Sequence, residues 1–263
     1  MPTALTIAGS DSSGGAGIQA DLKTFAAFGV YGTSAITAVT AQNTQGVGQI
    51  APLEADLVTA QIEAIAGDIT IHATKIGMLA TSAIVEAVAA AIEELELPLV
   101  VIDPVLISSS GSSLLDADGV QALRAELLPL ARVVTPNIPE AEALSGRRIQ
   151  SDDDLRDAAK RIRDLGPKAV IITGGHASGA DVTDLLLEEH TFHEFHTPRI
   201  AAPSTHGTGC TYASAIAAAL ARGFALTDAA RDAQQFVAGA IRHGLAIGNG
   251  RRVLNHFWRI PNP

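Results

Sequence analysis

The residues best suited to chemistry form one short loop late in the chain. Positions 204–211 read Ser-Thr-His-Gly-Thr-Gly-Cys-Thr, and an alanine-rich stretch follows them. Alanine is the strongest helix former, so we expect a helix from Thr208 or Gly209 to about Ala221. A glycine loop that leads into a helix brings unpaired backbone N–H groups to the positive end of the helix dipole, where they bind anions. The loop therefore predicts an anion site at residues 207–210.

The only cysteine of the chain, Cys210, falls in the first turn of this expected helix. The helix dipole favours a thiolate there, which makes the sulfur a candidate catalytic group. The alternative is a tight turn with a small, buried cysteine, a common place for a free thiol. Cys210 and His206 share one short loop with no third group to orient them, which argues against a thiol hydrolase. We expect His206, like His176, to be structural.

Polar loops follow the apolar runs of the chain at six places. In an open parallel sheet, ligands gather beyond the carboxyl ends of the strands. Each loop alone could be an ordinary turn, because Gly, Asn and Asp are turn residues. Six of them at one edge of a sheet predict a binding site. The loops are Gly9–Gly17, Gln42–Thr44, Asp103–Pro104, Asn137–Glu140, Gly174–His176 and Gly207–Cys210.

Two acidic residues among these loops suggest a metal site. Asp103 closes a run of apolar β-branched residues, and a carboxylate there is costly to bury unless it is paired or bound to a metal. With Glu140 on the neighbouring loop it could hold Mg²⁺, which takes few carboxylates together with water and phosphate oxygens. The alternatives are that Asp103 caps a turn and that Asn137 caps a helix. No His/Cys cluster has the spacing of a zinc site, which argues against a transition metal.

The first glycine loop matches a dinucleotide motif only in part. Residues 15–20 read G-x-G-x-x-A, but about six residues separate them from the expected first strand, and the second strand ends in Gln42-Asn43 instead of an acidic residue. A P-loop is excluded, because no G-x-x-x-x-G-K-[ST] occurs. We expect this loop to close over a small polar substrate beside Gln42.

The elements that must position these loops alternate between strands and helices. Repeated strand–helix units predict a mostly parallel sheet, with right-handed crossovers and helices on both faces. No repeat or linker interrupts the chain, so we expect residues 1–263 to form one domain. Strands are expected near 5–8, 31–39, 73–78, 99–102, 132–135 and 169–173, with an antiparallel pair at 182–187 and 191–196. Helices are expected at 18–28, 55–66, 81–95, 117–128, 151–165, 208–221 and 227–243, and a further helix opens at 136–140.

Composition excludes several classes of protein. The chain of 263 residues has a net charge of −10 and no basic run, which argues against nucleic acid as a partner. No apolar stretch reaches the roughly 18 residues of a membrane span, and the N-terminus lacks the basic start of a signal peptide. A single cysteine rules out an internal disulfide framework and fits the reducing cytoplasm.

Seven segments together resemble a known family. They are Ala8–Thr24, Ala41–Thr44, Lys75–Met78, Asp103–Val105, Thr135–Glu140, Gly174–His176 and Thr205–Thr211. The first and last are specific, and the similarity runs on to Asn255-His256. The chain resembles the hydroxymethylpyrimidine/phosphomethylpyrimidine kinases, which are the thiamine-pathway members of the ribokinase-like superfamily.

The resemblance implies a three-layer α-β-α fold with a mostly parallel central sheet. It implies ATP-dependent phosphorylation of 4-amino-5-hydroxymethyl-2-methylpyrimidine, and then of its monophosphate to the diphosphate. Mg²⁺, a cytoplasmic location and a homodimer are further expectations. Most ribokinase-like enzymes have an Asp base at the end of the late glycine motif, whereas this branch has Cys, here Cys210.

Site residues follow from the same resemblance. Gln42 can read an aminopyrimidine edge with one donor and one acceptor, and Met78 can pack on the ring face. The implied positions are Cys210, Gly207, Thr208 and Gly209 for catalysis; Gly9, Ala16, Asp21, Gln42 and Met78 for the pyrimidine; Asn137, Thr173 and Thr208 for the nucleotide; and Asp103 and Glu140 for Mg²⁺.

Two departures from the family pattern concern cations. Many relatives have a Lys before Gly-Gly-His, placed to touch ATP phosphates, where this chain has Thr173, and they often read Lys-Ser-Gly where it has Ser109–Gly111. Either change could weaken ATP binding, be offset by an arginine, or mark a specialised member. The alternatives are a pyridoxal kinase of the same superfamily and a non-catalytic pyrimidine-binding protein on this scaffold.

Overall fold

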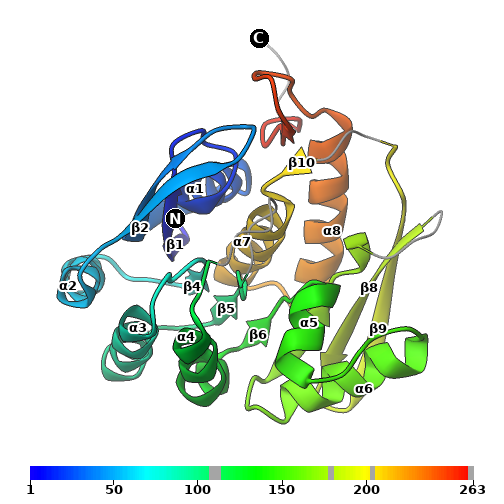
Figure 1. Cartoon of the computed structure of the whole chain (residues 1–263), viewed down its shortest axis with the longest axis horizontal. Helices are drawn as coiled ribbons and strands as arrows, with labels where there is room; N and C mark the ends of the chain where they lie inside the picture. Colours follow the sequence, from blue (N-terminus) through cyan, green and yellow to red (C-terminus); the bar gives the residue numbers. More distant parts are fainter. Residues whose placement is uncertain (107–113, 177–180, 202–204, 260–263) are drawn as a thin grey trace.

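The computed structural model describes residues 1–106, 114–176, 181–201 and 205–259. Within these residues a nine-stranded sheet runs in the order β3-β2-β1-β4-β5-β6-β7-β8-β9, between two layers of helices (Figure 1). The pairings from β2 through β7 are parallel, and those of β3, β8 and β9 are antiparallel. The strands are β1 (Thr3–Asp11), β2 (Tyr31–Gln42), β3 (Val47–Pro52), β4 (Ala73–Ile76), β5 (Val100–Ile102), β6 (Val133–Val134), β7 (Ala169–Ile172), β8 (Asp181–Glu188) and β9 (Thr191–Pro198).

Helices cover both faces of this sheet. Those on one face are α2 (Ala55–Ala66), α3 (Ser82–Glu94), α4 (Ala117–Ala122), α5 (Ile138–Ser145) and α6 (Asp152–Arg163), and those on the other are α1 (Gly17–Ala27), α7 (Thr208–Ala221) and α8 (Leu226–Arg242). The expected three-layer α-β-α fold is confirmed.

The sheet separates two hydrophobic cores, one on each face, because side chains along a buried strand alternate between the faces. Val100 and Ile102 of β5 pack in the core under α2–α6, while Val101 between them packs under α7 and α8. Successive side chains of a strand point to opposite faces, so a strand covered on both faces buries apolar residues at successive positions, as β5 does. Short apolar runs in the sequence therefore mark strands that are covered on both sides.

Helix boundaries agree with the local sequence signals. Thr81 caps α3, as expected, with its side chain accepting a hydrogen bond from the backbone N–H of Ile84. Ser151 caps α6, and the acidic residues 152–154 occupy its first turn. The helix expected over 117–128 is instead the short α4, one π-helical turn at Leu123–Leu127 and a 3₁₀ turn.

Three short elements were not predicted. The edge strand β3 pairs with β2, and a two-stranded parallel sheet joins β10 (Thr205–His206) to β11 (Arg252–Val253). The residues just before β11 pack on the loop that links β2 to β3, since Thr44 Oγ1 accepts a hydrogen bond from Gly250 and Thr44 O one from Arg251. The stretch after α8 thus reaches the edge of the sheet that carries the polar loops.

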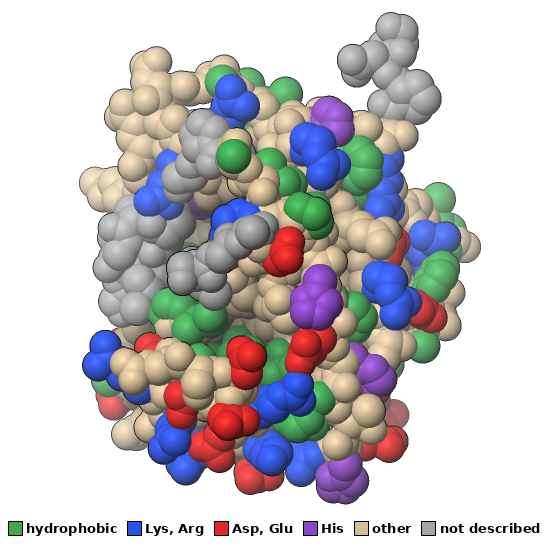
Figure 2. Space-filling view, turned by 90° about the vertical axis from the view of Figure 1, so that its right-hand side faces the viewer, with side chains coloured by type: hydrophobic (Ala, Val, Ile, Leu, Met, Phe, Trp, Pro, Cys, Tyr) green, Lys and Arg blue, Asp and Glu red, His purple; other side chains and the backbone are tan. Residues whose placement is uncertain are grey.

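The described surface mixes charges of both signs. Figure 2 shows acidic and basic side chains close together on the lower part of one face. Ion pairs among the described residues include Arg147–Asp154 and Arg161–Asp157. Among the described residues, no helix combines the length and apolar content needed to span a membrane. The Ser109–Gly111 position lies outside the described residues, as does the side chain of His176.

Candidate active site

A cavity of about 880 Å³ lies beyond the carboxyl ends of the parallel strands. All six of the predicted polar loops contribute residues to its wall, among them Asp11, Gln42, Asp103, Glu140 and Cys210. Because parallel strands end at the same edge of a sheet, loops that are far apart in the sequence meet there. The strand-end loops therefore share one cavity, and their expected role as a binding site stays a prediction.

The N-terminus of α7 forms one end of the cavity. Gly207 precedes the helix with φ of +88°, and a Cβ there would lie 1.9 Å from the carbonyl oxygen of Gly15, so the position requires glycine. No side chain caps the helix, and the first N–H groups of any helix lack an intrahelical acceptor. Residues 207–210 all line the cavity. Their expected role in binding anions stays a prediction.

The environment of Cys210 differs from the expected one. Burial raises the pKa of the Cys210 thiol well above its ordinary value; the positive charge of Lys75 opposes this rise, and the negative charges of Asp103 and Asp21 add to it. The expectation that the helix dipole favours a thiolate is therefore wrong for the ligand-free protein. Dehydration and two nearby carboxylates outweigh the dipole, and Cys210 is a neutral thiol there.

Beneath Cys210 lies a buried ion pair that the sequence analysis missed. Lys75 Nζ lies 3.0 Å from Asp21 Oδ2, and neither side chain is exposed. Asp21 also accepts hydrogen bonds from the hydroxyls of Thr6 and Ser214, both 2.6 Å away. Lys75 lines the cavity, whereas Asp21 does not. Asp21 was expected to contact the pyrimidine, but its carboxylate is hydrogen-bonded to Thr6 and Ser214 and paired with Lys75 outside the cavity wall. Its charge therefore reaches the site through Lys75.

Asp103 and Glu140 face the same cavity with little exposure to solvent. Burial and the charge of Asp103 raise the pKa of Glu140 to about 8, and burial also raises the pKa of Asp103, with Lys75 opposing. Two carboxylates that lose water and repel each other gain from a cation between them, so the pair fits Mg²⁺. Among the described residues no three His, Cys, Asp or Glu side chains gather, so further ligands would come from substrate and water.

Asn137 and Glu140 also stabilise the start of α5. Asn137 Oδ1 accepts a hydrogen bond from the backbone N–H of Glu140 at 3.0 Å, and Glu140 Oε2 accepts one from the N–H of Asn137 at 2.9 Å. This is a capping box, which confirms the alternative that Asn137 is a helix cap. Both residues still line the cavity, so the cap fixes where their side chains lie in it.

The region expected to hold the pyrimidine contains Gly9, Ala16, Gln42 and Met78, which all line the cavity. A Cβ on Gly9 would lie 2.7 Å from the Cε methyl group of Met78, so any larger residue at position 9 would displace Met78. Glycine at position 9 and methionine at position 78 together leave a slot with an apolar wall. Their direct contact with a substrate stays a prediction.

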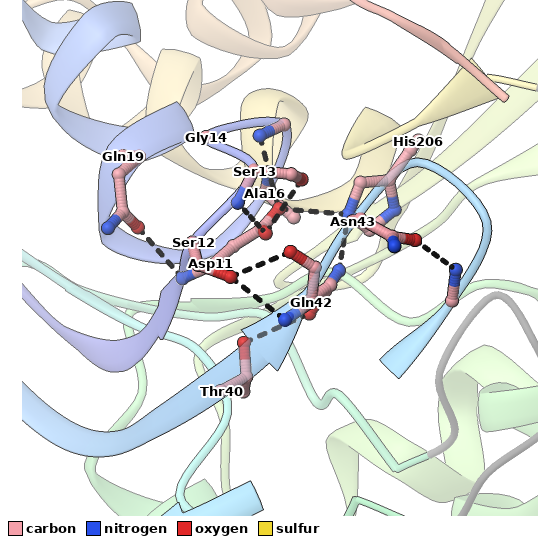
Figure 3. A network of polar contacts seen from close by, with 12 residues as sticks. Asp11, Ser12, Ser13, Gly14, Ala16, Gln19, Thr40, Gln42, Asn43 and His206 are labelled. Atoms are coloured by element: carbon pink, nitrogen blue, oxygen red, sulfur yellow. Dashed lines mark hydrogen bonds and ion pairs between the residues drawn. The ribbon is translucent and has the colours of Figure 1, made fainter. Parts of the chain in front are cut away.

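A polar network joins this slot to the loop before α7 (Figure 3). His206 Nε2 lies 3.1 Å from Asp11 Oδ2 and 2.7 Å from the terminal amide nitrogen of Gln42. Asp11 accepts further hydrogen bonds from the backbone N–H groups of Ser13, Gly15 and Ala16, which fold the first glycine loop around its carboxylate. Burial alone would raise the pKa of Asp11, but the hydrogen bonds from His206 and Ser13 lower it to about 2.

The opposite end of the cavity contains Thr173 and an arginine that the sequence analysis could not place. Arg199, just after β9, donates a hydrogen bond from Nη1 to the carbonyl oxygen of Gly175 at 3.0 Å. Thr173, Gly175 and Arg199 all line the cavity. No local motif marks Arg199, because only the pairing of β8 with β7 brings the end of β9 near Gly175.

Comparisons with known proteins agree with this arrangement. The family model for phosphomethylpyrimidine kinase matches residues 11–255. The hydroxymethylpyrimidine/phosphomethylpyrimidine kinase of Synechococcus elongatus is 50% identical over 99% of both chains. The thiamine biosynthesis bifunctional protein ThiED of Geobacter sulfurreducens is 45% identical over 96% of this chain, which spans about half (52%) of that longer protein.

Among solved structures, pyridoxal kinase from Bacillus subtilis, crystallised as an ADP complex, superposes with a TM-score of 0.92. It is 40% identical in sequence, and the match covers 100% of both chains. The fold thus serves kinases for different ring substrates.

Proposed function

The chain belongs to the phosphomethylpyrimidine kinase family, and we infer that it transfers phosphoryl groups from ATP in thiamine biosynthesis. Its substrates are 4-amino-5-hydroxymethyl-2-methylpyrimidine and the monophosphate of that compound, which becomes the diphosphate. One observation carries this proposal: a slot around Gln42, the start of α7 and the Asp103–Glu140 pair open into one cavity. A ring, a transferring phosphate and a nucleotide can therefore meet there.

Alignment and charge stabilisation are the main tasks of a phosphoryl-transfer enzyme. The N–H groups of Thr208, Gly209 and Cys210 would donate to the oxygens of the phosphoryl group in transit, because they sit at the uncapped start of α7. Gly209 lies next to the Asp103 carboxylate, since a Cβ there would be in van der Waals contact with it at 3.6 Å. The backbone, not a cluster of lysines, supplies most of the donors in this acidic chain.

Cys210 would accept the proton of the substrate hydroxyl in the first phosphorylation. Because its thiol is neutral at rest, Cys210 would first release its own proton to water in the cavity, and the positive charge of Lys75 would stabilise the thiolate that then takes the hydroxyl proton. The second phosphorylation starts from a phosphate that is already anionic and needs no base. There Cys210 would only position the substrate.

Asp103 and Glu140 would hold Mg²⁺, which supplies charge neutralisation for the leaving phosphates when it is bound. Asn137 holds Glu140 in place through the capping box and would itself lie against the nucleotide. Near Thr173, the guanidinium of Arg199 would supply the cation that a lysine provides in many relatives. A guanidinium can bind phosphate oxygens through two N–H groups at once.

The proposed cellular setting is a cytoplasmic homodimer. A single cysteine and a reaction that consumes ATP support a cytoplasmic location. A homodimer is supported by family resemblance and by exposed apolar side chains on β2, where Tyr31 and Val39 are 55% and 48% exposed.

A coupled ADP-release assay tests the proposed function. Hydroxymethylpyrimidine, its phosphate and pyridoxal are offered separately with MgATP. We expect ADP release with both pyrimidines and faster turnover with them than with pyridoxal. Release with pyridoxal alone would make the chain a pyridoxal kinase, and ring binding without ADP release would contradict the kinase assignment.

A further inference from the structure

Gln42 can read the edge of a ring only if its side-chain amide has a defined orientation. As placed in the structure, the amide nitrogen lies 2.7 Å from His206 Nε2 and the amide oxygen lies 3.3 Å from Thr40 Oγ1 (Figure 3); the hydrogen bonds of these two partners require the opposite placement. The oxygen and nitrogen of an amide have nearly the same shape, so their partners decide which atom occupies which place. For His206 Nε2 and for Thr40 Oγ1, the number of hydrogens that each atom carries decides whether it faces the oxygen or the nitrogen of the Gln42 amide.

His206 Nε2 must carry a hydrogen. It lies 3.1 Å from Asp11 Oδ2, and an ionised carboxylate can only accept hydrogen bonds. The hydrogens donated to Asp11 by Ser13, Gly15 and Ala16 confirm that this carboxylate acts as an acceptor on its other sides as well. The Gln42 atom that faces the same Nε2–H must then be the amide oxygen.

Thr40 gives the same answer independently. Its hydroxyl has one hydrogen, which it donates to the carbonyl oxygen of Ser10 at 2.9 Å. The remaining lone pairs of Thr40 Oγ1 can only accept, so the Gln42 atom that faces them must be the amide nitrogen. Two residues from different strands thus require one and the same orientation.

We propose that Asp11, His206 and Thr40 fix the Gln42 amide with its oxygen towards His206 and its nitrogen towards Thr40, which makes His206 a positioning residue that determines ring specificity. This inference rests on the proposed function, in which Gln42 binds the pyrimidine. The amide oxygen keeps a second lone pair and the nitrogen a second hydrogen for the ligand. The site therefore accepts a ring with an amino group on the His206 side and an unprotonated ring nitrogen on the Thr40 side.

The 4-oxo analogue of the substrate presents the opposite pattern. It has a carbonyl acceptor where the substrate has an amino donor, and an N–H donor where the substrate has a bare nitrogen. A freely rotating amide would adapt to either ring, but a fixed one leaves both polar pairs mismatched. Turning the ring over would restore the pairs, yet it would carry the 5-hydroxymethyl group to the wrong side for transfer.

The test compares the amino ring with its 4-oxo analogue, by kcat/KM and by calorimetric binding without ATP. For the native protein we expect a preference for the amino ring of at least about 100-fold. His206→Leu removes the donor and should reduce the preference to within about tenfold. His206→Gln, which keeps an N–H donor, should restore most of it. Asp11 retains its three backbone donors in both variants, so the first loop should stay folded.

An unchanged preference in His206→Leu, or equal binding of the two rings by the native protein, would overturn the inference. So would failure to bind either ring. Discrimination in calorimetry without ADP release would instead contradict the proposed function alone. Long-range ¹H–¹⁵N spectra of the ligand-free protein, with His206→Gln to identify the signal, give an independent readout: a His206 Nε2 without a hydrogen also overturns the inference.

Discussion

Lys75 and Asp21 form an ion pair at 3.0 Å in which neither side chain is exposed. The pair links β4 to α1 directly beneath the cavity, and Lys75 is its only member in the cavity wall. Breaking a buried pair leaves one charge without compensation, which costs far more than the pair itself contributes. The ion pair therefore contributes both to the free energy of unfolding and, through the charge of Lys75, to the electrostatic potential in the cavity.

We expect Lys75→Met to lower the free energy of unfolding by about 3–5 kcal/mol, because Asp21 is left charged and buried. The double variant Lys75→Met/Asp21→Asn should recover at least half of that loss. Urea titrations followed by circular dichroism measure both. A double variant no more stable than the single one would contradict the account.

Asp11 should make stability depend on pH in the acid range. Its pKa is lowered to about 2 in the folded protein, from 3.8, so the ionised form stabilises the fold above pH 4 and this contribution disappears as the pH falls towards 2. Asp11→Asn should therefore cost about 2 kcal/mol at pH 7 and less than about 1 kcal/mol at pH 2.5, where the folded-state carboxyl is partly protonated. Denaturant titrations at several pH values measure the difference, and a cost independent of pH would refute the charge-based explanation.

Cys210→Ala should damage the first phosphorylation more than the second. Loss of a general base typically costs about 100-fold or more in rate, whereas the second substrate needs no base. Because burial raises the pKa of Cys210, the first step of the native protein should also speed up as the pH rises from 7 to 9. Single-turnover assays of each step measure this, and an equal loss of both would reject the division of roles.

Arg199→Met should raise the KM for ATP by about tenfold and leave the KM for the pyrimidine within about twofold, because only the nucleotide end of the cavity loses a cation. Arg161→Met, on an exposed side chain of α6, is the matched control and should change neither constant. If Arg199→Met alters the pyrimidine KM instead, the nucleotide lies elsewhere.

Gly207 should tolerate no side chain. Gly207 and Gly223 have similar φ angles of +88° and +85°, but only at Gly207 does a Cβ meet backbone, 1.9 Å from Gly15 O. Gly223→Ala should cost about 1 kcal/mol from its left-handed backbone, and Gly207→Ala at least about 3 kcal/mol because the first loop is also pushed away. Equal costs in thermal unfolding would show that the close approach does not matter.

Local patterns were sufficient for most of the fold and for the location of the site. The alanine run and the preceding glycines predicted α7 with its observed bounds, Thr208 to Ala221. Each of the six predicted strand-end loops contributes residues that line the cavity. β3 escaped prediction because Gly48 and Pro52 are poor strand formers, and its pairing with β2 holds it in place.

Long-range contacts explain what the sequence analysis missed. Asp21 and Lys75 are 54 positions apart, and Asp11 and His206 are 195 apart, so no spacing rule connects them. The error on the Cys210 thiol has the same origin. A dipole is visible in a local pattern, but the two carboxylates come from distant parts of the chain, Asp21 from α1 and Asp103 from the loop after β5.

The contact of Gly250 and Arg251 with Thr44 has a consequence for biosynthesis of the protein. A nascent chain leaves the ribosome with its N-terminus first, so the loop at Thr44 emerges some 206 residues before its partner. That side of the cavity can close only after residues 250 and 251 have been made. Substrate bound in the complete cavity therefore cannot assist the early stages of folding during translation, which depend on the elements that precede Gly250.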